Sequence, residues 1–513
     1  MAMILASAAR SAGAAESKAD LLERMAREKF GNLSRAELLL VRSAPQRELQ
    51  WAGPRDDPDD PTNDPLHAQS WGPERTIRAP LLAWLGSDPA AAPLVHPSGA
   101  GIKAARIVGP LDLSYLTVPF PLTLVRCSIA DGIDISNAHI RAIDLRASAT
   151  GPIVGNMARV DGDVSLTFGN YQQVLFYRAT IGGSLDFSAA RVQSPGSPAV
   201  AAIDSSIGGD AIFHQGFATN GIVDFRLARV GHALSFNHAS FFGPQENGLV
   251  AERARIEGSL YWVAISLTPN TQLDLADARA TDLWDDQSSW PVRGNLMLNG
   301  FEYEGFGDDS PADARSRLIW LRRQPRGFRA QPYAELARAL TAAGETDDAI
   351  KVEIAQRVAQ RRETGLGRLE RAWNALLQYT IGYGFIPLRA LWWITGFVAL
   401  GTVLFQWGYT MRLVSPTEEA AYQSFMKSGT TPAHYPRFNA FVYSLENFLP
   451  VVDLHQGEYW RPNPYHGAHL NPELKKCPRG GVLLRWYLWV HILAGWILTP
   501  LLAAGLSGLI HVG

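Results

Sequence analysis

Residues 179–187 read Ala-Thr-Ile-Gly-Gly-Ser-Leu-Asp-Phe, and this nine-residue phrase, Ala-x-[Ile/Val]-x-Gly-x-[Leu/Val]-x-[Leu/Phe], recurs between residues 105 and 303. Its copies and variants start at Ala105, Ala158, Ala179, Ser205, Ala228, Ala254 and Ala278. From Ala158 onward the starts are 21, 26, 23, 26 and 24 residues apart. A repeat of this period is the sequence signature of a solenoid.

Apolar and polar residues alternate within each phrase, as they do in a strand that buries one face. The small Ala and Gly positions are expected where the coil turns and where successive coils press together. We therefore predict a mainly β fold in which residues 101–304 form a right-handed parallel β-helix of about seven to nine coils. Ile181, Leu185 and Phe187 point inward in this fold. Aspartates of the repeats are expected on its solvent side: Asp144, Asp163, Asp186 and Asp224.

Helical patterns flank the solenoid on both sides. Residues 1–100 are predicted to form an N-terminal helical region with a Pro- and Asp-rich linker, and Ser34 and Glu37 have the spacing of a capping box. Residues 333–362 place apolar side chains at helical spacing, which predicts a helical hairpin that caps the solenoid. This hairpin belongs to a connector, residues 305–388, whose last part is basic and leads toward the C-terminal domain.

The C-terminal part, residues 389–513, contains two apolar runs long enough to cross a membrane. Residues 390–409 carry no charge, and residues 486–510 contain one ionisable group, His491. Basic residues precede both runs, and they favour a cytoplasmic position for the N-terminal end of each. Two simple crossings cannot place both N-terminal ends on the same side of the membrane. Because long loops weaken this rule and no secretory signal opens the chain, we expect a multi-pass protein of a bacterial inner membrane with the solenoid facing the cytoplasm.

Composition and motifs argue against a catalytic role. Lys and Arg number 47 against 49 Asp and Glu, which gives no bulk attraction to nucleic acid. Cys127 and Cys477 provide neither a disulfide framework nor a zinc spacing. Dinucleotide, Walker A, nucleophile-elbow and HExxH patterns are missing, so we expect no catalytic residue and no cofactor. His466 and His469 have the spacing of metal ligands, but histidines in a loop at the membrane interface are the favoured interpretation.

Between the two apolar runs lies a short apolar segment, from Phe438 to Leu454, that is too short and too polar to cross a membrane alone. It predicts a helix over 438–452 that is either re-entrant or interfacial, and the two alternatives are evenly balanced. In the re-entrant alternative the order of elements is that of a pore domain. The residues that would then lie in the pore or at its mouth are Ser444, Glu446, Asn447, Pro450, Asp453 and Glu458.

From about residue 70 to its end, the chain resembles a family of bacterial β-solenoid membrane proteins with pentapeptide-like repeats, some of which are labelled membrane-associated oxidoreductases. The phrases that carry the resemblance, besides the repeats, are Trp71 to Ala79, Gln331 to Ala337, Ile381 to Gly384 and Tyr443 to Leu454. This resemblance implies an architecture rather than an activity, and no residue pattern in the chain supports the oxidoreductase label.

A second resemblance is to the pore helix of two-span potassium channels, and it rests on Ala440, Tyr443, Ser444, Leu445 and Glu446. Those channels continue with Gly-Tyr-Gly-Asp, whereas this chain has Pro-Val-Val-Asp at 450–453. The departure implies a wider or less selective pore than a potassium filter. The layout also resembles bacterial antiphage systems in which a channel effector carries a soluble sensor domain.

These observations predict an oligomeric membrane channel or pore-forming effector whose cytoplasmic solenoid acts as a sensor. Two spans cannot enclose a pore, so we expect a cyclic homo-oligomer, a tetramer by analogy, surrounded by membrane lipid. A nucleotide, an oligonucleotide or a regulatory protein would act through the hairpin, with anions drawn to Arg322, Arg323, Arg326, Arg329 and Arg338. The alternatives are a membrane-anchored scaffold without a pore and a membrane-associated oxidoreductase.

Overall fold

The computed structural model describes residues 16–46, 48–54, 60–195, 197–363, 367–384, 386, 388–464 and 479–507. The chain forms two compact units, Met1–Gln356 and Arg357–Gly513. The boundary between them lies within helix α6 (Thr346–Glu363), in the predicted connector. The first unit contains the repeats, and the second contains the two apolar runs.

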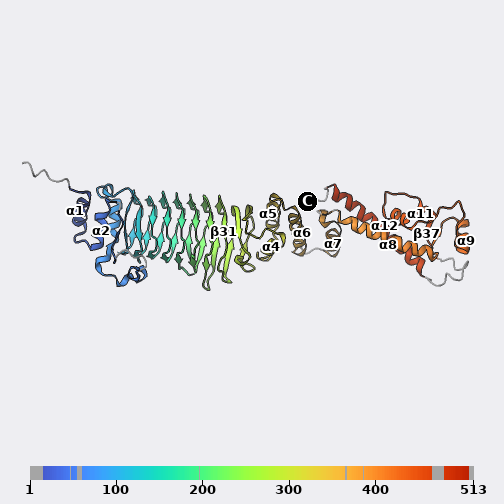
Figure 1. Ribbon diagram of the computed structural model, residues 1–513, viewed down its shortest axis with the longest axis horizontal. Helices are drawn as coiled ribbons and strands as arrows, with labels where there is room; N and C mark the ends of the chain where they lie inside the picture. The colour runs from blue at the N-terminus through green and yellow to red at the C-terminus, as the bar shows by residue number, and fades with distance from the viewer. Residues whose placement is uncertain are drawn as a thin grey trace, which may run out of the picture. The chain divides into compact units, whose positions relative to one another are not determined.

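The first unit contains a parallel β-solenoid of about 9 turns, which confirms the predicted parallel solenoid (Figure 1). Each short strand pairs with its equivalents in the coils before and after it, as β10 (His139–Ile140) does with β6 (Thr117–Val118) and β14 (Arg159–Val160). Within the described residues the strands form sheets of 18, 9 and 8 members, and the largest sheet combines two columns. One coil therefore has four strands: β10, β11 (Ile143–Asp144), β12 (Ala149–Thr150) and β13 (Ile153–Val154).

Buried positions in the coils follow a five-residue pattern rather than simple alternation. In the coil that begins with β10, the spacing between buried residues is alternately two and three: Ala138, Ile140, Ile143, Leu145, Ser148, Thr150 and Ile153. Two residues of every five thus point inward, one pair for each side of the coil. The buried hydroxyl of Ser148 donates to the Leu124 carbonyl oxygen at 2.7 Å, so this polar group is satisfied inside the core.

The nine-residue phrase is a corner of the coil and not one strand, so the single-strand interpretation of its alternation is wrong. Its two halves are β18 (Thr180–Ile181) and β19 (Leu185–Asp186), which belong to neighbouring columns. The inward residues of both strands and Phe187 are buried, as predicted. A Cβ atom on Gly208 would collide with the carbonyl oxygen of Gly182 in the preceding coil. The expectation that glycine lies where coils press together is therefore confirmed.

Other corners place non-glycine residues in the left-handed backbone region, with φ of 56° at Met157 and 60° at Phe168. Each such residue costs about 1–2 kcal/mol relative to glycine. Aspartate side chains stabilise several corners by accepting hydrogen bonds from backbone N–H groups. The Asp224 carboxylate accepts from the Arg226 backbone N–H at 3.1 Å and pairs with the Arg226 guanidinium at 2.6 Å. Asp224 is only 2% exposed, so the expectation that it faces solvent is wrong. The arginine satisfies the buried carboxylate.

Helices precede the first coils. Helix α1 (Lys18–Phe30) contacts α2 (Arg35–Ser43), and the capping box predicted for Ser34 and Glu37 is present at the start of α2. The Glu37 carboxylate also accepts from Arg78 Nε at 2.7 Å. This ion pair joins α2 to the strand β2 (Thr76–Arg78), the first strand of the eight-stranded sheet.

After the last coils, a buried ion pair attaches helix α4 (Ala314–Leu321) to strand β33 (Arg279–Asp285). Arg317 donates to both carboxylate oxygens of Asp285, at 2.8 and 2.7 Å, and both side chains are buried. Helix α5 (Gln331–Ala342) contacts β35 (Glu302–Phe306), where Glu335 Oε1 accepts from the backbone N–H of Tyr303 at 3.1 Å.

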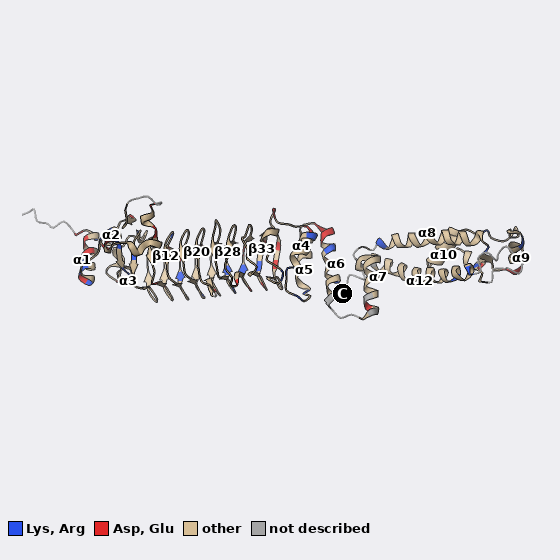
Figure 2. Cartoon of the chain, turned by 90° about the horizontal axis from the view of Figure 1, so that it is seen from below, with Lys and Arg blue, Asp and Glu red and all other residues tan. Residues whose placement is uncertain are grey.

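The second unit contains helices, listed with their bounds here: α7 (Arg368–Ile381), α8 (Arg389–Thr410), α9 (Glu419–Ser428), α10 (Ala440–Phe448), α11 (Gln456–Tyr459) and α12 (Gly480–Leu506). Strands β36 (Val414–Pro416) and β37 (Trp460–Pro462) form an antiparallel pair. Helix α8 matches the predicted run 390–409, whereas α12 begins at Gly480, before the predicted 486. Lys, Arg, Asp and Glu residues are sparse along α8 and α12 (Figure 2).

Candidate functional site

The second unit contains two helices, α8 and α12, that are long and apolar enough to cross a membrane among the described residues. Only 22% of the apolar window of α8 and 17% of that of α12 are buried within the protein. The exposed side chains include large aromatic and aliphatic groups: Trp392, Leu400, Val403, Trp486, Leu493 and Trp496. The core helix of a water-soluble domain buries such side chains, so these two helices do not have the character of a soluble core.

Helix α10 packs against both α8 and α12. Its start is fixed by Asn439, whose Oδ1 accepts from the backbone N–H groups of Phe441 and Val442 at 3.1 Å. Its buried residues recur at spacings of three and four, so they form one face of the helix: Ala440, Tyr443, Ser444 and Phe448. The exposed Phe441 lies away from this face.

The ring contacts of α10 define how far along α8 it extends. Phe438, just before α10, stacks on Tyr409 near the C-terminal end of α8, with ring centroids 4.9 Å apart. Phe448, at the end of α10, stacks on Phe397 in the middle of α8, with centroids 5.7 Å apart. Helix α10 therefore runs antiparallel to α8 from its end to its middle. The chain then returns, because Gln456 Oε1 accepts from the backbone N–H of Asn439 at 3.1 Å.

A buried cluster of polar groups joins the three helices. Ser444 Oγ donates to the carbonyl oxygen of Val398 on α8 at 2.9 Å. His491 Nε2 on α12 lies 3.0 Å from the carbonyl oxygen of Ser444, and the Tyr487 hydroxyl lies 3.3 Å from His491 Nδ1. A carbonyl oxygen can only accept, so Nε2 carries the hydrogen and Nδ1 accepts from Tyr487. Ser444 and His491 are both completely buried.

Two glycines allow this close approach of the helices. A Cβ atom on Gly401 of α8 would lie 2.8 Å from His491 Cε1 and would also overlap Ser444 Oγ. A Cβ atom on Gly495 of α12 would lie 2.7 Å from the carbonyl carbon of Phe448. Small residues at contacts between apolar helices let their backbones approach closely, as in membrane helix pairs.

The other predicted pore residues lie after Ser444, on α10 and in the returning chain. Glu446 accepts from the backbone N–H groups of Gln456 and Gly457, at 2.7 and 3.1 Å, and so fixes the start of α11. Asn447 Nδ2 donates to the Tyr443 carbonyl oxygen at 2.8 Å. The side chains of Glu446 and Asn447 therefore both make hydrogen bonds within the protomer. The side chain of Glu458 is exposed.

The turn between α10 and α11 contains Pro450 and Asp453. The Asp453 carboxylate accepts from the backbone N–H of His455 at 3.0 Å and from its ring Nδ1 at 2.9 Å. Both side chains are exposed in the protomer, so this pair lies at the surface of the returning segment.

The five predicted anion-binding arginines lie on three successive segments, the end of α4, the connection to α5, and α5 itself. Arg322 and Arg323 follow α4, and Arg326 and Arg329 lie in the connection to α5. Arg338 on α5 pairs with Glu335 at 2.7 Å. Two cavities lie along the described part of the solenoid, one lined by Arg106 and Arg191 and the other by Arg255 and Arg279, and none of the five predicted arginines contributes to either lining. The weak metal candidates His466 and His469 lie outside the described residues, within which no cluster of three or more metal-ligand side chains occurs.

Sequence reasoning identified Ser444 but missed its neighbours Gly401 and His491, and it also missed Gly495, which allows the close approach of Phe448. The available signal was His491, the one ionisable side chain within the second apolar run. A scan against protein-family models and searches of curated proteins and of solved structures found no match.

Proposed function

We propose that the chain is a channel-forming protein that assembles as a cyclic homo-oligomer, a tetramer by analogy, in a bacterial inner membrane. Helices α8 and α12 are its spans, and α10 with residues 449–455 is a re-entrant element. The observation that carries the proposal is the position of α10, which ends beside the middle of α8 and then returns. An interfacial helix would lie across the ends of the spans and not along half their length.

The backbone leaves the helical conformation after Phe448, the last residue of α10. Irregular backbone at membrane depth is tolerated only where protein or water satisfies its polar groups. Val451 in this segment is 85% exposed in the protomer, so one copy does not cover it. Neighbouring copies around a water-filled axis would provide both protein contacts and water. The C-terminal end of α10 carries the negative pole of the helix dipole, which together with Asp453 favours cations.

The membrane-anchored scaffold remains the competing interpretation, with α10 as a packing helix. It accounts for the buried Ser444 and His491 but gives no reason for an exposed Val451 in the irregular segment that follows α10, which ends beside the middle of α8. The oxidoreductase alternative requires a cofactor cradle or convergent titratable groups. The titratable side chains of His491 and Tyr487, which meet among the described residues of the second unit, take part in hydrogen bonds between packed helix faces.

The solenoid would act on the spans through α5 and α6, which we take as the cap of a right-handed solenoid. Contacts of α5 with the last coil support this role: Gln331 Oε1 accepts from the Gly300 N–H at 2.7 Å, and Glu335 accepts from Tyr303. A ligand that binds two arrangements of this contact differently would supply the coupling, about 1–3 kcal/mol in typical cases. In a cell, the solenoid would then be the cytoplasmic sensor of the channel.

The test is conductance and ion selectivity of the purified full-length protein in a planar bilayer with a KCl gradient. We expect cation selectivity, and Asp453→Asn should move the reversal potential toward zero. The matched control is Glu418→Gln, which removes an exposed carboxylate outside the returning segment. Absence of conductance from protein that runs as a monomer by mass photometry would refute the channel. An equal shift with both variants would refute the role of Asp453.

A further inference from the structure

A cavity of about 470 Å³ lies on the eight-stranded sheet of the solenoid. The floor is made by β4 (Arg106–Val108), β8 (Ser128–Ile129), β12, β16 (Asn170–Tyr171) and β20 (Arg191–Val192). One side is formed by the short helix η2 (Pro65–Ser70), which contributes Leu66 and Gln69 to the lining. The cavity therefore runs across successive coils, bounded by a segment that precedes the solenoid.

Strand register aligns one column of side chains along the floor. Arg106 pairs with Ser128, and the column continues through Ala149 and Asn170 to Arg191. The two arginines are four strand spacings apart, about 19 Å between their backbones. The side chains of the floor between the two arginines are small, which leaves a groove with a positive group at each end. Amide side chains accompany them: Gln69, Asn170, Gln172 and Gln193.

The charge of this groove is of one sign. Among the described residues its lining contains Arg106 and Arg191 and no carboxylate. Neither arginine makes an ion pair with any residue that the structure describes. Two guanidinium groups in a concave site, with no carboxylate among the described residues of its lining, raise the local concentration of anions.

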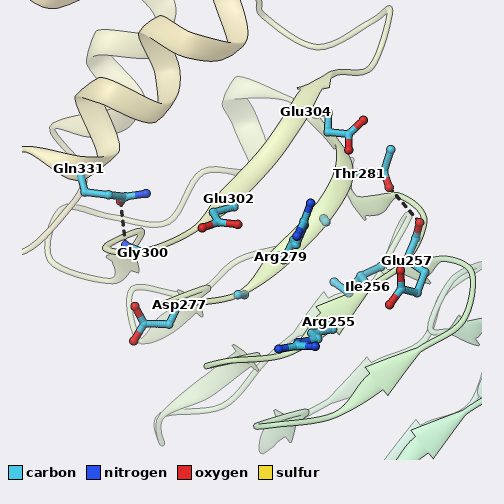
Figure 3. A pocket seen from close by; sticks show the side chains of 12 residues that line it. Arg255, Ile256, Glu257, Asp277, Arg279, Thr281, Gly300, Glu302, Glu304 and Gln331 are labelled. Carbon is cyan, nitrogen blue, oxygen red and sulfur yellow. Dashed lines mark hydrogen bonds between the residues drawn. The ribbon is translucent and has the colours of Figure 1, made fainter.

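The cavity over β30 (Arg255–Ile256), β33 and β35 provides the contrast (Figure 3). It is larger, about 630 Å³, and it also contains two arginines, Arg255 and Arg279. Four carboxylates share its lining: Glu257, Asp277, Glu302 and Glu304. These acids outnumber the arginines, so that cavity gives no net attraction to an anion. Of these two cavities, the groove over β4–β20 is therefore the one that attracts an anion.

We propose that the groove over β4–β20 binds a short single-stranded oligonucleotide, with its phosphates on Arg106 and Arg191 and its bases against the amide side chains. Arginine binds phosphate oxygens through two parallel N–H donors. Asn and Gln amides match the donor and acceptor pattern of base edges, which a single strand leaves open. An elongated polyanion fits the separation of the two arginines, which a single phosphate cannot bridge. The inference rests on the first unit and does not depend on conductance.

The experiment is fluorescence anisotropy of a labelled tetranucleotide with the full-length protein in a neutral detergent. We expect Arg106→Gln and Arg191→Gln each to weaken binding about tenfold. The matched control, Arg229→Gln, changes an exposed arginine of another column and should leave binding unchanged. The logarithm of affinity should fall with that of salt by about 0.7 for each phosphate neutralised, so each variant should reduce the slope by that amount.

Three results would overturn the proposal. The groove is not the site if the wild type does not bind, or if the double variant Arg106→Gln/Arg191→Gln binds as the wild type does. The ligand is not an oligonucleotide if inorganic polyphosphate competes equally well and Asn170→Ala leaves the affinity unchanged. Selective loss of tetranucleotide binding in Asn170→Ala, with polyphosphate a weak competitor, would support recognition of bases.

Discussion

Replacing Gly401 by alanine should separate α10 from the two apolar helices. The added Cβ would lie 2.8 Å from His491 Cε1 and would overlap Ser444 Oγ. Real Cβ atoms do not approach other atoms so closely, so the helices must move apart or the hydrogen-bond cluster must rearrange. Gly396, on the same helix, is the matched control, because no described atom lies within 4 Å of a Cβ built there.

The magnitude follows from comparing the two variants. Glycine to alanine within a helix gains up to about 1 kcal/mol from backbone propensity, and this gain is common to both positions. Overpacking costs about 1–3 kcal/mol, and only Gly401→Ala suffers it. The difference between the variants should therefore be about 1–3 kcal/mol in the free energy of opening α10. This corresponds to an exchange rate about 5- to 150-fold faster for its backbone amides.

Hydrogen exchange with mass spectrometry on the detergent-solubilised full chain measures this opening directly in peptides covering 440–448. Solenoid peptides act as an internal control, because they should exchange equally in both variants. Adding Ser444→Ala to Gly401→Ala should recover part of the loss, since it removes one of the two overlaps. Equal exchange of α10 in Gly401→Ala and Gly396→Ala would refute the close packing of the three helices.

Three further predictions concern the solenoid. Met157→Gly should stabilise it by about 1 kcal/mol against urea, because Met157 has a φ of 56° that glycine adopts without strain; no gain would contradict the strain argument. Burial raises the pKa of the Cys127 thiol to about 12, so in a Cys477→Ser background iodoacetamide should react with Cys127 only after unfolding. The contribution of the buried neutral thiol to folding stability should be complete below the unfolded pKa of about 9 and should be lost as pH rises toward 12. Rapid labelling of the folded chain would contradict this. Arg317→Met should lower the free energy of unfolding, measured with urea, by about 3–5 kcal/mol, because it leaves the buried Asp285 carboxylate unpaired. Adding Asp285→Asn should restore part of this loss. A change below about 1 kcal/mol in Arg317→Met would refute the buried pair.

The sequence was sufficient for the parts of the molecule whose signal is local and repeated. The recurring phrase predicted a parallel solenoid because each copy must bury its apolar residues against the next coil. The runs at 390–409 and 486–510 predicted two apolar helices, because length and composition alone decide that property. The capping box at Ser34 and Glu37 is equally local, since it needs only three residues of separation.

Other features depended on contacts between distant parts of the chain. The phrase at 179–187 alternates like one strand, yet it turns a corner, because neighbouring coils rather than its own residues set the position of Gly182. The sequence marked Ser444 as a pore residue, whereas the folded protomer buries it against Val398 and His491. These residues are 46 and 47 positions from Ser444, and no periodicity extends over such a distance. Sequence thus determined which segments are strands and apolar helices. Only the tertiary structure decided which polar groups meet, because a hydrogen bond between two helices forms only where their packing brings the donor and the acceptor together.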